Sequence, residues 1–196
     1  MPLFVQVRCA GRVATALVVL LVLDAIVGAR TIPFPSAALG AQGIALRLLL
    51  PVGSALAIRR SLACGDPERE RLSPRPVGWY DAAGVAAYVA VLVAATAVQN
   101  AIDPTTGWLG VRGALGLIGV ALVEMALIGR SAPSIAPVLL VLVSATFGGA
   151  AGGSASWWAW AVDPSPARRS WVIAGGLFAA GLAATGLRLE RRRRHA

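Results

Sequence analysis

The feature that most constrains this chain is a series of apolar runs, 17 to 22 residues long, separated by short polar stretches. A helix needs about 20 mostly apolar residues to cross the hydrocarbon core of a bilayer. The chain is 57% hydrophobic and only 14% charged, whereas soluble domains are about a quarter charged. The sequence therefore predicts an all-α fold, a single transmembrane domain over residues 1–196. We expect six spans, at residues 13–29, 37–58, 80–101, 108–128, 134–151 and 171–187.

The segment 59–76, RRSLACGDPERERLSPRP, gives these spans a direction. It holds five arginines and three carboxylates and is the only long polar segment before the C-terminal tail. Loops rich in arginine stay on the cytoplasmic side of a membrane. With this loop inside, thirteen of the 18 arginines lie on the cytoplasmic side. We therefore expect a plasma-membrane protein with cytoplasmic N- and C-termini, embedded in the lipid bilayer.

The first span and its flank leave two alternatives open. Residues 1–12 carry Arg8 and Arg12 beside apolar side chains, which is consistent with a helix on the membrane surface or with a simple basic flank. Val27 and Ala29 also fit the small-residue pattern of a signal-peptide cleavage site. Asp24 inside the apolar run argues against cleavage, so we expect a retained span.

Two sequence features predict how the spans are shaped and packed. Pro51 is expected to kink the second span, because proline lacks an N–H and crowds the preceding turn. Gly113, Gly116 and Gly119 recur every three residues in the fourth span. Such small residues permit close contact between helices.

Three charged residues fall inside predicted spans, where an unpaired charge costs several kcal/mol. They are Asp24, Arg47 and Glu124. Arg47 has a side chain long enough to reach either carboxylate. These residues could line a substrate or proton path, or form a structural ion pair that fixes helix packing. A pattern of three residues leaves both alternatives open.

Aromatic residues are expected to mark the membrane–water boundary, where the amphipathic rings of tryptophan and tyrosine gather. A short re-entrant piece is predicted at 154–162, because the SWWAWAV sequence follows a glycine-rich stretch. The predicted interfacial anchors are Trp79, Tyr80, Trp108, Trp157, Trp158, Trp160 and Trp171.

The residue inventory argues against several classes of function. The chain has no lysine, so it contains neither a P-loop lysine nor a Schiff-base lysine. Cys9 and Cys64 form no CxxC pair, and His195 is the only histidine, so we expect no metal site and no cofactor. No catalytic motif is present, and the arginine clusters lack any recognisable nucleic-acid-binding module. We expect neither an enzyme nor a nucleic-acid-binding protein.

The second half of the chain resembles a known family. The stretch GWLGVRGALGLIGVALVEMALIGR is followed by Ala-Pro, a further apolar run, WWAWAVDP, a last span and a basic end. This order resembles the membrane (permease) subunits of type 2 ABC exporters, in the small permease-like form of high-GC Gram-positive (actinobacterial) bacteria. The resemblance covers residues 100–196 in detail and the whole chain in topology.

The resemblance implies six spans, a homodimer or a heterodimer with a related permease, and a cytoplasmic ATP-binding subunit. The loop between spans two and three would contact that ATPase subunit, and residues 154–162 would be the re-entrant piece. At 196 residues the chain is shorter than usual for the family and its N-terminal piece is stunted. The predicted coupling residues in that loop are Arg59, Arg60, Asp66, Glu68, Arg69, Glu70 and Arg71.

The sequence therefore predicts an ABC-type export permease that moves a hydrophobic or amphipathic compound outwards. The alternative is a membrane-embedded accessory or scaffold protein without a transport path of its own.

Overall fold

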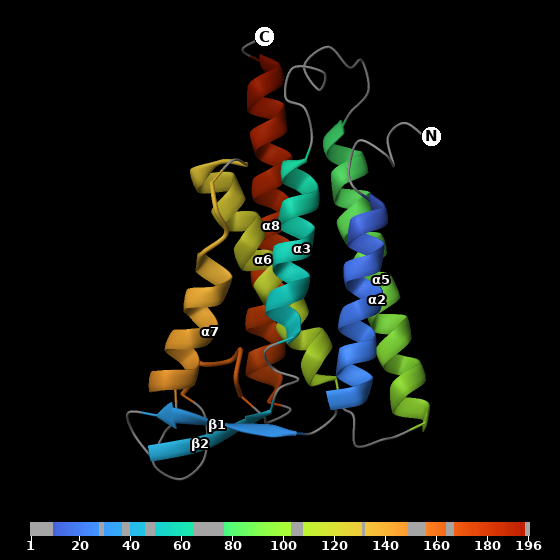
Figure 1. Ribbon diagram of the computed structural model, residues 1–196. Helices are drawn as coiled ribbons and strands as arrows, with labels where there is room; N and C mark the ends of the chain where they lie inside the picture. Colours follow the sequence, from blue (N-terminus) through green and yellow to red (C-terminus); the bar gives the residue numbers. More distant parts are fainter. Residues whose placement is uncertain are drawn as a thin grey trace.

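The computed structural model describes residues 10–27, 30–36, 40–45, 50–64, 77–102, 108–130, 132–148, 156–163 and 167–194. Within these residues the chain forms six helices and one β-hairpin (Figure 1). The predicted helical class is confirmed, whereas the hairpin was not expected. The elements are α2 (Ala10–Val27), β1 (Thr31–Ser36), β2 (Gly40–Ala45), α3 (Leu50–Ala63), α5 (Val77–Ile102), α6 (Leu109–Ile128), α7 (Ala136–Phe147) and α8 (Arg168–Arg194).

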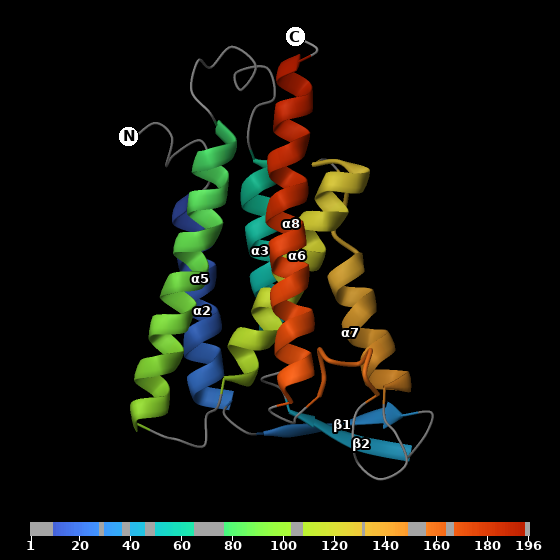
Figure 2. The same ribbon diagram turned by 180° about the vertical axis from the view of Figure 1, so that it is seen from behind.

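The helices lie side by side and alternate in direction along the chain (Figures 1 and 2). At one end of the bundle, here called the loop end, α3, α6 and α8 finish and α2, α5 and α7 begin. The β-hairpin and residues 156–163 lie at the opposite end, here called the hairpin end. The two flanks of residues 65–76 therefore meet at the loop end, together with the turn between α6 and α7.

Helix α6 is the central element of the bundle. In its most apolar window 67% of the residues are buried, compared with 17% in α5. It packs most extensively against α8 and then against α3. The largest contribution to the buried apolar core comes from α6: Val111, Ala114, Leu117, Ile118, Ala121, Leu122 and Met125.

The predicted glycine stripe on α6 is confirmed as a site of close packing. A Cβ added to Gly113 would lie 3.0 Å from the ring of Pro51 on α3. One on Gly116 would overlap the indole of Trp160, and one on Gly119 would overlap the backbone of α8 at Leu177. The three glycines thus let three different elements approach one helix.

The prediction for the second span is wrong in its first half. Residues 40–45 form β2, which pairs antiparallel with β1 from Thr31↔Ala45 to Ser36↔Gly40. Gly40 and Gly43 are poor helix formers. Pro33 and Pro35 are two residues apart, so their missing N–H groups fall on one edge of β1 and leave the other edge able to pair.

The helix that was expected to run through residues 37–58 instead covers Leu50–Ala63. Pro51 therefore lies in its first turn, where a missing N–H costs no helical hydrogen bond, so the predicted kink is replaced by a helix start. The C-terminal half of α3 includes residues 59–63, so the start of the predicted polar loop is helical.

The other boundaries follow the predictions more closely. Helices α2, α5 and α6 match residues 13–29, 80–101 and 108–128 to within three residues. Helix α7 ends at Phe147, four residues before the expected limit, where Gly148 begins the glycine-rich stretch. Helix α8 begins three residues early and continues to Arg194.

Among the residues that the structure describes, two helical stretches are long and apolar enough to cross a membrane, Tyr80–Ala101 and Leu109–Ile128. Length and composition are the only criteria met, and the buried core helix of a soluble protein meets them too.

We expect Gly119→Ala to destabilise the bundle by roughly 1–3 kcal/mol or more, because the added methyl meets the backbone of α8, which cannot rotate away. Gly176→Ala is the matched control, since nothing lies within 4 Å of its position. Thermal unfolding in mild detergent measures both. Equal melting temperatures for the two variants would contradict the close packing of α6 on α8.

Candidate functional site

The loop end of the bundle contains a buried ion pair between α3 and α6. Arg59 on α3 and Glu124 on α6 expose only 4% and 7% of their side chains. The Arg59 Nη1 atom lies 3.3 Å from Glu124 Oε2 and also donates a hydrogen bond to the Ala121 carbonyl at 3.3 Å. Its Nη2 atom donates to the carbonyls of Ala132, at 2.6 Å, and Gly129, at 3.4 Å. Arg59 thus binds the backbone of the turn between α6 and α7 as well as a carboxylate.

Glu124 connects the same site to the start of α7. Its Oε1 atom accepts hydrogen bonds from the backbone N–H groups of Ile135, at 3.0 Å, and Ala136, at 3.1 Å. Its Oε2 atom also accepts one from the Ser134 hydroxyl at 3.1 Å. A carboxylate is favoured here because the N-terminus of a helix carries a partial positive charge and unpaired N–H groups. Glu124 therefore serves as the N-terminal cap of α7.

A second ion pair reaches the same turn from α5. The Arg130 Nη2 atom lies 3.1 Å from Asp81 Oδ2, and the two side chains expose 30% and 11% of their surface. Arg130 follows Gly129, whose φ of +118° ends α6 in a conformation that other residues rarely adopt. The turn between α6 and α7 is therefore held from both α3 and α5.

A third polar cluster lies at the hairpin end and was not predicted. Arg112, in the first turn of α6, is fully buried and donates a hydrogen bond to the backbone carbonyl of Asp163. The Asp163 carboxylate accepts a hydrogen bond from the Ser170 hydroxyl at 3.0 Å. The cluster fastens residues 156–163 between α6 and α8.

The three charged residues expected within the spans are not brought together. Asp24 is half-buried near the end of α2 at the hairpin end, whereas Glu124 lies near the loop end. Arg47 lies outside the described residues. Glu124 pairs with Arg59, which the sequence had assigned to the polar loop and not to the bundle.

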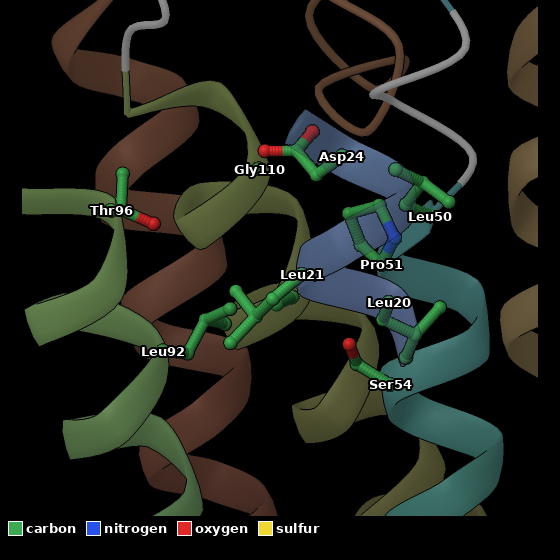
Figure 3. A pocket seen from close by; sticks show the side chains of 10 residues that line it. Leu20, Leu21, Asp24, Leu50, Pro51, Ser54, Leu92, Thr96 and Gly110 are labelled. Carbon is green, nitrogen blue, oxygen red and sulfur yellow. The ribbon is translucent and has the colours of Figure 1, made fainter. Parts of the chain in front are cut away.

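Asp24 lines a narrow cleft between α2, α3, α5 and α6 (Figure 3). In Figure 3 its carboxylate points towards the first turn of α6, at Gly110, and Ser54 and Thr96 supply the other polar groups of the lining. The space open to water is about 30 Å³, enough for only one or a few water molecules. The remaining lining residues are apolar: Leu20, Leu21, Leu50, Pro51, Leu92 and Ala114.

The predicted coupling residues divide into two groups. Arg59 is buried in the ion pair with Glu124, so it is a core residue and not an accessible loop residue. Arg60, one position on, is exposed in the last turn of α3. The others lie outside the described residues: Asp66, Glu68, Arg69, Glu70 and Arg71.

The predicted aromatic anchors also differ in burial. Trp157 exposes 69% of its surface, while Tyr80 and Trp108 expose 40% and 41%. Trp160 exposes only 4%, because Gly116 leaves room for its ring, so its indole packs inside the bundle. Trp158 and Trp171 are half-buried, and the side chain of Trp79 lies outside the described residues.

Among the residues that the structure describes, no group of three or more His, Cys, Asp or Glu side chains is arranged to hold a metal ion. Comparison with known proteins found no matching family, curated protein or solved structure.

We expect Glu124→Gln to lower the free energy of unfolding by about 3 kcal/mol, because the change leaves Arg59 as a buried charge without its counter-charge. Arg60→Gln is the matched control, since Arg60 is the exposed neighbour of Arg59. Denaturation of the purified protein in mixed micelles measures both variants. A Glu124→Gln protein as stable as Arg60→Gln would show that the pair contributes nothing to folding.

Proposed function

We propose that this chain is a multi-pass protein of the plasma membrane, with six spans and cytoplasmic N- and C-termini. The distribution of side chains supports the proposal, because Arg59, Arg112 and Glu124 are buried inside the bundle while large apolar side chains are exposed on the outside of its helices. In water such a surface would aggregate, whereas hydrocarbon solvates it at no cost. Exposed apolar residues occur on α2, α5, α6, α7 and α8, including Ile26, Val91, Val98, Leu127, Leu139, Phe147 and Val172.

The alternation of the helices supports the predicted orientation. The loop end holds the end of α3 with Arg60, the turn with Arg130 and the arginine-rich end of α8. Cytoplasmic ends of membrane proteins are enriched in arginine and lysine. The loop end is therefore assigned to the cytoplasm and the hairpin end to the outside.

Two helices, α3 with 14 residues and α7 with 12, are shorter than the roughly 20 residues that cross a bilayer unaided. Each continues at the hairpin end into non-helical chain: β2 lies before α3, and residues 156–163 follow α7. Non-helical backbone is tolerated at membrane depth where it is buried in protein. Residues 159–161 are buried, in keeping with the short re-entrant piece expected at 154–162.

Within this membrane protein, the function supported best is that of a permease subunit of an ABC-type exporter. The observation that carries it is the arrangement of the chain: both flanks of residues 65–76 lie at the arginine-rich end, and residues 156–163 fold back between the last two helices at the other end. The sequence has no lysine and hence no P-loop of its own. Energy would come from a separate ATP-binding subunit, and the permease would act as a homodimer or with a related permease on a hydrophobic or amphipathic compound.

One observation favours the alternative of an accessory or scaffold protein. The cleft beside Asp24 has room for only one or a few water molecules, far less than a transported compound needs. In the permease interpretation the path opens between two copies of the chain or in another conformational state. In the accessory interpretation the chain has no path, and its loop end serves only to bind partners.

Affinity purification from the native host in mild detergent, followed by mass spectrometry, distinguishes these functions. We expect a nucleotide-binding subunit in a fixed ratio to the tagged protein, and its loss when residues 66–73 are deleted. That deletion leaves α3 complete, including the buried Leu62. Arg168→Gln, at the hairpin end, is the control and should retain the subunit. A folded protein that captures no such subunit would replace the permease with the accessory function.

A further inference from the structure

Two ion pairs connect the helices on either side of residues 65–76 to one turn. The two helices contribute charges of opposite sign to these pairs. Before this segment, α3 contributes the cation in the pair Arg59–Glu124, at 3.3 Å. After it, α5 contributes the anion in the pair Asp81–Arg130, at 3.1 Å. Glu124 lies in the last turns of α6 and Arg130 immediately follows that helix. Both flanks are therefore fastened to the turn between α6 and α7.

The pair on the α3 side also holds backbone atoms. Arg59 donates to the carbonyls of Gly129 and Ala132, which lie within the turn itself. Glu124 accepts the N–H groups of Ile135 and Ala136, which begin α7. A continuous series of polar contacts thus runs from α3 through Arg59 and Glu124 to the first residues of α7.

Directional contacts of this kind resist separation of the segments that they join. A buried guanidinium and carboxylate are costly to separate, because each would remain charged in a low-dielectric environment. The ion pairs and backbone hydrogen bonds therefore favour movement of the connected segments together.

The C-terminal end of α7 extends this series of contacts to the hairpin end of the bundle. The Ser156 N–H donates a hydrogen bond to the Gly148 carbonyl at 2.8 Å, and a Cβ on Gly148 would meet Ala159. Helix α7 is therefore attached at its start to the loop end and at its finish to residues 156–163. A shift of α7 along its axis would act on both ends of the bundle.

We propose that Arg59–Glu124 and Asp81–Arg130 form one mechanical unit, the double clamp, which transfers displacement of the end of α3 and the start of α5 to the N-terminus of α7. Glu124 and Arg130 are its positioning residues. The source of the displacement rests on the proposed function, in which an ATPase subunit binds at the loop end. The mechanical linkage itself is a property of this chain alone.

Amide hydrogen exchange on the full chain in lipid nanodiscs tests the double clamp without a partner. The informative variant is Arg130→Gln, because it breaks the ion pair with Asp81 on α5, whereas exchange is followed at the amides of Ile135 and Ala136 and in the last turn of α3, where the Cys64 N–H donates to the Arg60 carbonyl. We expect exchange at both places to rise about threefold or more, in line with the coupling usual between linked residues. Asp81→Asn breaks the same pair from α5, leaves the turn unaltered and should give the same result. Arg168→Gln, an exposed arginine at the hairpin end, should change neither place.

Faster exchange confined to residues 129–132 and the start of α5 would overturn the proposal, because the two ion pairs would then act independently of each other. That outcome is separate from the test of the proposed function. A chain that captures no ATPase subunit can still show linked exchange, and a chain that captures one can show independent exchange.

Discussion

The loop end of this bundle depends on a buried guanidinium–carboxylate pair whose two members also bind helix ends. Arg59 donates to the carbonyl of Ala121, about two turns before the end of α6, and to that of Gly129 just after it, where the helix dipole is negative. Glu124 accepts N–H groups at the N-terminus of α7, where the dipole is positive. Each charge is thus neutralised by the other and by a helix terminus of opposite sign. This double compensation makes burial of both groups tolerable and fixes the turn between α6 and α7.

The hairpin end uses the same kind of contact for a different purpose. Arg112 lies in the first turn of α6, where the dipole disfavours a cation, and it is fully buried. Its compensation comes from outside the helix, through the carbonyl of Asp163. Helix α6 therefore holds a buried arginine contact near each end. Between them Gly113, Gly116 and Gly119 allow the neighbouring elements to approach, so one helix organises the bundle by small residues in its middle and polar contacts at its ends.

The sequence predicted the positions of most helices well, but it did not predict which segments and charged side chains pair with one another. Apolar length fixes where a helix is favourable, and α5 and α6 accordingly begin and end close to the expected residues. Residues 37–58 were less predictable, because their apolar composition suits a helix while Gly40 and Gly43 weaken one, and pairing with β1 decided the outcome. Arg59 was assigned to a polar loop because it opens an arginine-rich run. No local signal reveals that α3 continues past it and turns its side chain inwards.

By itself, the sequence determined the helical class, the positions of most helices, the excess of arginine at one end and the close-packing role of the glycines. These properties follow from the chemistry of consecutive residues: apolar length, charge and the absence of a Cβ. Only the tertiary structure decided which charges are paired. Arg59 and Glu124 are 65 positions apart in the chain. Their pairing depends on the position of α3 along its axis relative to α6. The packing of the whole bundle sets that relative position.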